Sequence, residues 1–314
     1  MEEVIVKKVE SKLKNFFYNY DLNLCLACGT CANGCPLTGM PELGNMNVMK
    51  MLRLLSLGLV EEVAESDFPW LCTGCGRCTY ACPMGVEVPA IMETVKRLRP
   101  RDRVPGVTSS RPEAVEPASL SENYEGLLGD LGEELSEAEC PGFPMGTTAV
   151  YDYLIKIIKS GSVKIDRSPH HGKLFTFHDA CRHGRVLERF FGKGYYDEPR
   201  WIIRQCVEDF VEMWPNRSNS LCCGAGGAMR STYFEKQSAY YGREKLRSIQ
   251  ATKADVVVVG CSKCHYQIQH RLPMNYPDCR FEVKYIWDLV LESIVGAREV
   301  EHTAELQRLV REAG

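Results

Sequence analysis

Two cysteine runs near the start of the chain constrain its fold more than any other feature. Both have the spacing C-x2-C-x2-C-x3-C-P. Their cysteines are Cys25, Cys28, Cys31 and Cys35 in the first run, and Cys72, Cys75, Cys78 and Cys82 in the second. The chain has sixteen cysteines in 314 residues, and its first residues are charged where a secretory leader needs an apolar segment. Metal ligation or redox chemistry is therefore expected, rather than a disulfide framework.

The spacing of both runs resembles the ligand run of two-cluster bacterial ferredoxins. In those proteins three thiolates of one loop bind one cubane [4Fe–4S] cluster, and the cysteine before the proline binds the other. The resemblance implies one cubane on Cys25, Cys28, Cys31 and Cys82, and a second on Cys72, Cys75, Cys78 and Cys35. Glycines inside the runs, Gly29, Gly74 and Gly76, would let the backbone pass close to the clusters. A pair of zinc sites is the alternative, but zinc sites combine C-x2-C pairs rather than a triple with a proline-linked fourth cysteine.

The segment between the two runs has a helical pattern of apolar residues. Val48, Met51, Leu52 and Leu55 recur at helical spacing, and Asn45 or Asn47 could cap the helix start. The sequence thus predicts a mainly helical ferredoxin-like domain over residues 1–98. Residues 99–144 are rich in proline, glycine, serine and glutamate and predict a linker that contains Cys140 as a plain thiol.

Residues 145–314 show strands that alternate with helices. Strands are expected over 173–179, 254–260 and 281–286, and helices over 149–161, 185–191, 200–214, 232–254 and 287–295. This order predicts an α/β domain with a parallel sheet, so the whole chain is of the α plus α/β class. Cys181 and Cys261 each follow the end of a strand, and such ends meet at one edge of a parallel sheet.

Five cysteines of this second part form one pattern. They are Cys181, Cys222, Cys223, Cys261 and Cys264, with the spacing C-x40-C-C-G-x36-C-x2-C. This pattern, with its HDACR opening, resembles the CCG domain in the B-type subunit of heterodisulfide reductase, and the first domain resembles the C-type subunit of that enzyme. The whole chain is therefore similar to fused subunits of this family, such as the D-type subunit.

The resemblance implies that the five cysteines bind a noncubane [4Fe–4S] cluster. The B-type subunit has two CCG motifs, whereas this chain has one, so a single noncubane cluster is expected. Adjacent thiolates such as Cys222 and Cys223 repel one another unless bound iron compensates their charge. Three glycines, Gly224, Gly226 and Gly227, would let the loop fold over inorganic sulfide.

Other residues near the motif have less specific interpretations. His178 and His265 could each give a proton to a product thiolate, or could make structural hydrogen bonds. Arg182, His183 and Arg185 would surround Cys181 with positive charge, unless this loop is simply solvated. Cys206 fits a buried core thiol, and Cys279 has no assigned role. A phosphate loop and a dinucleotide fingerprint are both missing from the sequence.

These features predict an iron–sulfur subunit of a heterodisulfide reductase-like complex in anaerobic metabolism. It would be an oxidoreductase acting on a sulfur group. Electrons would pass through the two cubanes to the noncubane cluster. That cluster would reduce a disulfide, small or protein-borne, or a related sulfur substrate. The alternative is a pure electron-transfer subunit that links a flavoprotein, or a membrane quinone or haem subunit, to another oxidoreductase. Either function needs such partner subunits.

Charge and hydropathy limit the other partners. A net charge of −3 gives no basic surface for nucleic acid. The most apolar stretch, residues 51–60, contains Arg53 and is about half the length that a membrane span needs. We expect a cytoplasmic protein without a transmembrane segment, attached peripherally to the inner face of the membrane through a partner.

Overall fold

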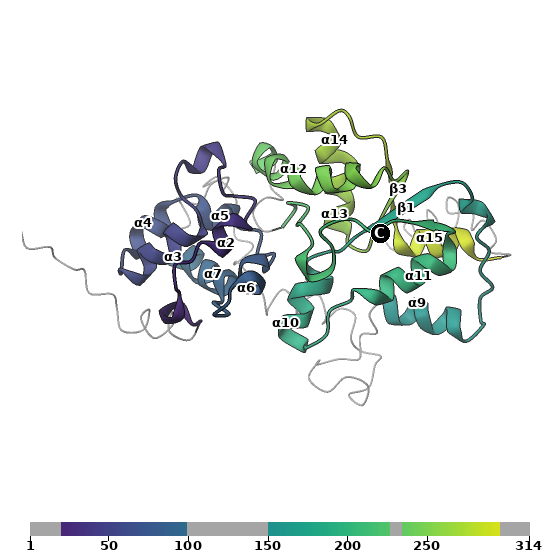
Figure 1. Ribbon diagram of the computed structural model, residues 1–314, viewed down its shortest axis with the longest axis horizontal. Coiled ribbons are helices and arrows are strands. Elements are labelled where there is room, and N and C mark those ends of the chain that lie inside the picture. Colours follow the sequence, from purple (N-terminus) through teal and green to yellow (C-terminus); the bar gives the residue numbers. More distant parts are fainter. Residues whose placement is uncertain (1–19, 99–149, 227–233, 296–314) are drawn as a thin grey trace, which may run out of the picture.

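The computed structural model describes residues 20–98, 150–226 and 234–295, which form a helical part and an α/β part (Figure 1). The predicted linker, with Cys140, lies outside the described residues. The outer limits of the two predicted domains, residues 1–98 and 145–314, stay predictions. The fold class is confirmed, since a helical region precedes a parallel sheet with helices.

Short helices joined by tight turns build the first part. They are η1 (Leu22–Leu24), α2 (Thr30–Asn33), η2 (Pro41–Leu43), α3 (Val48–Ser56), α4 (Val60–Glu65), α5 (Phe68–Leu71), α6 (Arg77–Ala81) and α7 (Val88–Leu98). Asn47 caps α3 by accepting a hydrogen bond from the backbone N–H of Lys50 at 3.0 Å, as one of the two predicted caps. Met51, Leu52 and Leu55 of α3 are buried, which confirms the predicted core face.

A four-stranded parallel sheet forms the centre of the second part. Its strands are β1 (Leu174–His178), β2 (Asp209–Phe210), β3 (Val256–Val259) and β4 (Glu282–Tyr285), in the order β2-β1-β3-β4. Within β1 and β3, His178 lies opposite Val259. The two strands therefore end at the same edge of the sheet, as the sequence predicted for the cysteines that follow them.

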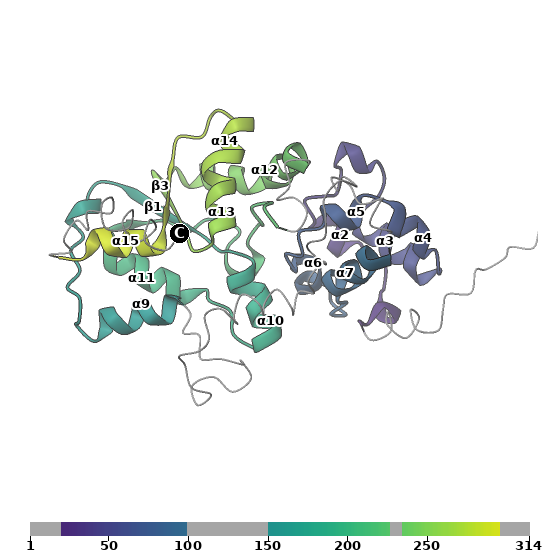
Figure 2. The same cartoon turned by 180° about the vertical axis from the view of Figure 1, so that it is seen from behind.

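Helices cover both faces of this sheet (Figures 1 and 2). Their bounds are α9 (Val150–Lys159), η4 (Ser168–His170), η5 (Arg182–Val186), α10 (Leu187–Phe191), α11 (Asp197–Cys206), η6 (Arg217–Asn219), α12 (Glu235–Thr252), α13 (Ser262–Tyr266), η9 (Gln267–Arg271), α14 (Leu272–Asn275) and α15 (Ile286–Ser293). Phe175 and Val256 face the core shared with α9, α11 and α15. Val257 faces the opposite core, formed with α12, α13 and α14. Alternate strand residues thus enter two apolar cores, and each buried large side chain stabilises the fold by about 1.5–3 kcal/mol.

The helix predicted over residues 200–214 is wrong beyond Cys206. Val207 takes an extended conformation, and β2 then pairs in parallel with β1, Leu174 with Asp209 and Phe175 with Phe210. The backbone N–H of Val211 also donates to the carbonyl of Phe175 at 2.9 Å. The free edge of β1 therefore decides the conformation of a segment whose apolar spacing is typical of a helix.

The two parts pack directly against each other. Tyr241 of α12, Cys222 and Phe234 belong to the same apolar core as the helices of the first part. Figures 1 and 2 show α6 and α10 side by side at this junction, and an ion pair joins Glu87 to Arg189 of α10. The junction places the second cysteine run beside the cysteine-rich part of the sheet domain.

Candidate functional site

The structure gathers the first predicted ligand set around one cavity. Cys25, Cys28, Cys31 and Cys82 line it, together with apolar side chains such as Leu52 and Val86. Cys82 reaches this set from the end of α6, so the fourth thiol comes from the second cysteine run. Burial raises the pKa of the Cys31 thiol to about 11, while Cys28 is exposed to solvent.

A second cavity is lined by Cys35, Cys72, Cys75 and Cys78. Here the fourth thiol, that of Cys35, comes from the first run. The exchange arises because α2 and α6 pack against each other. Each helix contains the third cysteine of its run, Cys31 or Cys78, and the fourth cysteine follows the helix end. Gly29 and Gly76 precede these helices with φ of 80° and 72°, a conformation that favours glycine. The structure thus brings together the two groups of four that the ferredoxin resemblance implied.

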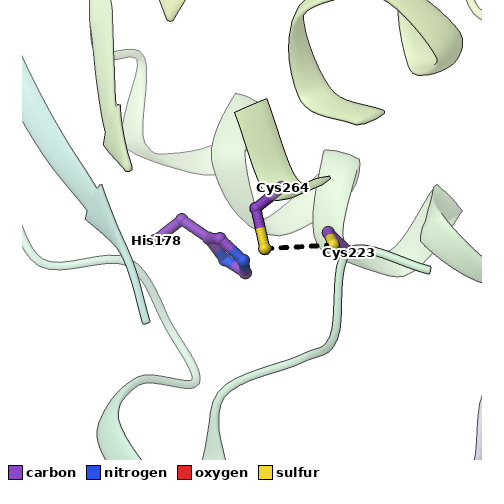
Figure 3. A group of neighbouring side chains, drawn as sticks. All are labelled: His178, Cys223 and Cys264. Carbon is purple, nitrogen blue, oxygen red and sulfur yellow. Dashed lines mark hydrogen bonds between the residues drawn. The ribbon is translucent and has the colours of Figure 1, made fainter. Parts of the chain in front are cut away.

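The five cysteines of the CCG pattern meet at the edge where β1 and β3 end. Cys181 follows β1, Cys261 follows β3 and Cys264 lies on α13. Cys222 and Cys223 lie on the loop before α12 and complete the group. The Sγ atoms of Cys223 and Cys264 are 3.3 Å apart (Figure 3). The strand ends therefore position two of the five thiols, and α13, which follows β3, positions a third.

Interactions among these thiols favour the deprotonated form at two of them. Cys222 and Cys264 lower the pKa of the Cys223 thiol well below its usual range. Cys264 likewise lowers the pKa of the Cys261 thiol to about 6. A thiolate rather than a thiol binds metal, so these two positions are prepared for ligation.

His178 belongs to the same group, as the sequence suggested. One of its ring nitrogens and the Sγ atoms of Cys223 and Cys264 all lie within 4.8 Å of one another, and all three side chains are buried (Figure 3). Burial, and then Lys245, lower the pKa of the imidazole, which favours the neutral ring. His265 lies apart from this group, with its ring stacked on Tyr285 at 4.2 Å between centroids. A proton-donor role stays a prediction for both histidines.

A buried ion network supports the residues around Cys181. Arg200 donates to both carboxylate oxygens of Asp179, at 2.7 and 2.9 Å, and also to Glu212. Asp179 further accepts from the backbone N–H of Arg217 at 2.8 Å. Although burial opposes ionisation, hydrogen bonds and charge from Arg200 lower the pKa of Asp179. The network fixes the short segment between β1 and Cys181.

The second cysteine run contacts the CCG group directly. Thr73 Oγ1 lies 3.8 Å from the Sγ of Cys222 and donates to the hydroxyl of Tyr241 at 3.1 Å. That hydroxyl also lies 3.4 Å from the Sγ of Cys75. Interaction with Cys222 lowers the pKa of Cys75 well below its usual range. The two cysteine groups therefore adjoin without any intervening layer of the protein.

Arg185 of η5 links the second cysteine run to the segment that precedes Cys222. Its Nε donates to the carbonyl of Cys75 at 3.0 Å, and its Nη1 donates to the carbonyls of Ser218 and Ser220, both at 2.8 Å. Burial disfavours the charge of this guanidinium, but Cys75, Cys181 and Cys222 together raise its pKa. Of the basic residues predicted beside Cys181, Arg185 is thus a buried structural cation rather than part of a solvated loop.

Two of the three predicted loop glycines have a steric reason in the structure. Gly224 has φ of 91°, and a Cβ there would lie 2.7 Å from the carbonyl oxygen of Ser238. A Cβ on Gly226 would lie 2.6 Å from the carbonyl oxygen of Thr73. Gly227 lies outside the described residues. Contact of these glycines with inorganic sulfide stays a prediction.

Sequence reasoning missed three side chains of the site. Thr73 and Tyr241 have no sequence signature of such a role, and only their contacts with Cys222 and Cys75 reveal them. Lys245 is buried, and its Nζ donates to the Sδ of Met213 at 3.2 Å. Cys206, the last residue of α11, is fully buried in the apolar core, as predicted. Cys279 lies away from the five-thiol group and donates to the carbonyl of Tyr276 at 3.1 Å.

The donor chemistry fits iron–sulfur clusters. Every described cysteine is a free thiol, and thirteen of them fall into the three groups above. Groups that consist of thiols, set in largely apolar surroundings, suit soft thiophilic metal centres such as iron–sulfur clusters. The residues that would hold the two cubanes and the third cluster are those that the sequence named, and their ligand roles stay predictions.

Fold and cysteine groups together define an iron–sulfur protein with a dicluster domain ahead of a cysteine-rich domain. A family model described as a 4Fe-4S dicluster domain matches residues 21–86, and one described as a cysteine-rich (CCG) domain matches residues 175–269. The chain thus contains both domains that its sequence resembled.

The relatives include subunits of heterodisulfide reductases. The D-type subunit of the dihydromethanophenazine:CoB–CoM heterodisulfide reductase of Methanosarcina mazei is 28% identical over 166 residues, 52% of this chain and 34% of that protein. The C-type iron-sulfur subunit of the CoB–CoM heterodisulfide reductase of Methanopyrus kandleri is 41% identical over 75 residues, 24% of this chain and 36% of that protein. A probable membrane-anchored ferredoxin of Chromohalobacter salexigens is 28% identical over 137 residues, 42% of this chain and 19% of that protein.

The matched regions thus span between 19% and 36% of the length of these three relatives. No solved structure gives a significant match. Among the helices of the described residues, none combines the length and the apolar character that a membrane span requires.

Proposed function

We propose that the chain is the iron–sulfur subunit of a heterodisulfide reductase-like complex that reduces a disulfide or related sulfur substrate. The single observation that carries the proposal is the contact between the second cysteine run and the CCG group through Thr73, Tyr241 and Cys222. When bound, the clusters would supply one-electron transfer at the two groups of four cysteines and sulfur–sulfur bond reduction at the group of five.

The exposure of the cysteines favours one direction of electron flow. Cys28 of the first group is exposed, whereas Cys75 of the second group and Cys222 and Cys223 of the CCG group are buried. A partner that docks over the first group would come closest to an exposed ligand. These buried cysteines lie deeper in the chain, and the second group lies beside the CCG group, which supports an ordered path from the surface to the CCG group.

The protein side chains have distinct tasks in this function. Tyr241 and Thr73 hold the two cysteine groups together and exclude water between them. Arg185 supplies a fixed positive charge beside Cys75, Cys181 and Cys222, which offsets the negative charge of their thiolates. The partner subunits we propose are a flavoprotein or a membrane quinone or haem subunit, with the chain held on the inner face of the membrane by that partner.

Disulfide turnover by the Cys223→Ala variant tests the proposal. The holoprotein is purified without oxygen and reduced chemically, candidate disulfides are added, and the electron paramagnetic resonance of the three centres is followed. Cys223→Ala should lose disulfide reduction and the signal of the CCG centre, while both cubane signals stay reducible. Cys206→Ala is the matched control, because that thiol is equally buried but lies outside the three groups.

Two outcomes would contradict parts of this scheme. If no candidate disulfide changes the CCG signal while a partner still reduces all three centres, the chain is a pure electron-transfer subunit. If Cys223→Ala also removes the cubane signals, the assignment of Cys223 to a separate third centre is wrong.

A further inference from the structure

We infer that the pocket at the junction of the two parts is a binding site for a small organic anion. The pocket has a volume of about 340 Å³, which lies in the range of sites for small molecules. The second cysteine run and helices α6 and α7 form one wall, and η5 and α10 form the other. The site therefore exists only where the two parts of the chain meet.

The charges that line the pocket do not cancel. Four basic side chains line it, namely Lys96, Arg182, Arg185 and Arg189, against two acidic ones, Glu87 and Glu93. Arg189 pairs with Glu87, and the Nζ of Lys96 lies 4.0 Å from a carboxylate oxygen of Glu93. Arg182 and Arg185 have no carboxylate partner within the described part of the chain, so two of the four basic side chains are not matched by an acidic side chain of the pocket.

Arg185 is a built feature of this pocket rather than a mobile surface charge. Its side chain is only 4% exposed, and the backbone carbonyls of Cys75, Ser218 and Ser220 hold its Nε and Nη1. Its Nη2 is buried and has no hydrogen-bond partner among the described residues. A buried N–H of a charged group without an acceptor is costly, and a bound carboxylate or phosphate would satisfy it.

Arg182 is the second half of the anion site. It is half-buried, lines the pocket and makes no hydrogen bond or ion pair with the described residues. Two guanidinium groups in one pocket suit the planar oxygens of a carboxylate. A ligand held there would lie beside the loop of Cys72 and Thr73, which adjoins the CCG group.

Two sources of such an anion are distinguishable. The anion could be the charged end of the sulfur substrate, in which case its identity rests on the proposed function, or it could be a sulfur-free carboxylate. The probes are 3,3′-dithiodipropionate and suberate, two dicarboxylates of equal length, the second with methylenes in place of the two sulfurs. Bis(2-hydroxyethyl) disulfide is the uncharged control.

Titration calorimetry of the oxygen-free holoprotein measures the three dissociation constants without any turnover. Both dicarboxylates should bind, and the uncharged disulfide should bind at least about tenfold more weakly. Arg182→Gln should weaken dicarboxylate binding about ten- to hundredfold, as expected for the loss of a charge-assisted hydrogen bond. Arg247→Gln, which removes a 70% exposed arginine of α12 that does not line the pocket, should leave binding unchanged. Iron content and the melting temperature show that each variant is folded.

The outcomes separate the two proposals. Tighter binding of dithiodipropionate than of suberate assigns the pocket to the sulfur substrate, and equal binding assigns it to a sulfur-free anion. Binding of neither dicarboxylate, or equal binding by Arg182→Gln and the unmodified protein, would overturn the anion site and leave the two arginines as counter-charges for the cysteines. A protein that binds suberate but reduces no disulfide would retain the anion site and lose the proposed function.

Discussion

Replacing Gly226 by alanine would place a methyl group directly against the loop of the second cysteine run. The added Cβ would lie 2.6 Å from the carbonyl oxygen and 2.9 Å from the Cβ of Thr73, whereas ordinary contact begins at 3.4 Å. The two backbones must therefore separate by about 0.8 Å. Overpacking of this kind costs about 1–3 kcal/mol. In a chain of 314 residues that loss lowers the melting temperature by roughly 1.5–4.5 °C.

Thermal unfolding of the oxygen-free holoprotein, followed by circular dichroism, measures this change. Gly34→Ala is the matched control, because it lies between two cysteines of the first run, has φ of −86° and leaves 3.5 Å between its Cβ and the nearest atom. The control should keep or slightly raise the melting temperature. If Gly226→Ala melts at the same temperature as Gly34→Ala, the contact between the CCG loop and the second cysteine run is not as tight as described.

Three further predictions address the interface, the ion network and the order of the centres. Tyr241→Phe and Thr73→Val should show a coupling of about 0.5–1.5 kcal/mol in a double-mutant cycle by urea unfolding, and strictly additive effects would contradict their hydrogen bond. Asp179→Asn should lose about 3–5 kcal/mol of unfolding free energy because it breaks a buried pair with Arg200. The control Asp197→Asn breaks an exposed pair with Arg217 and should lose less than about 1 kcal/mol. Equal losses in the two variants would count against the network. On exposure to oxygen, the electron paramagnetic resonance signal of the centre at Cys28 should decay before that of the centre at Cys75, because Cys28 is exposed and Cys75 is buried. The reverse order would refute the proposed entry point for electrons.

Local patterns of the sequence were sufficient to predict the main parts of the site. The resemblance of the cysteine runs to two-cluster ferredoxins implied that Cys82 and Cys35 belong to opposite groups, and in the structure each lines the cavity of the other run. The apolar strands before Cys181 and Cys261 predicted their convergence, since the ends of parallel neighbours must share an edge. The first inference rests on a resemblance of motifs and the second on the geometry of parallel strands, so neither needs the packing between the two parts to be known.

Contacts between distant segments could not be predicted in this way. Thr73 and Tyr241 are 168 positions apart, and neither residue type signals a partner. The segment of the two-residue strand β2 has the apolar spacing of a helix. It forms a strand because it pairs with the open edge of β1, and its own sequence does not show that edge. Arg185 lies in a basic sequence that resembles an ordinary surface loop, and only three converging carbonyl acceptors show it to be buried.

The exchange of Cys35 and Cys82 between the two groups also affects how the protein is made. Cys82 is synthesised 51 positions after Cys31, so at about 5–20 residues per second the first group waits roughly 3–10 s for its fourth thiol. Its first three cysteines leave the ribosome in that interval without the residue that completes them. With the ligand assignment proposed above, loading of iron at either group would depend on the folding of both, and the first set of thiols would stay incomplete until α6 has formed.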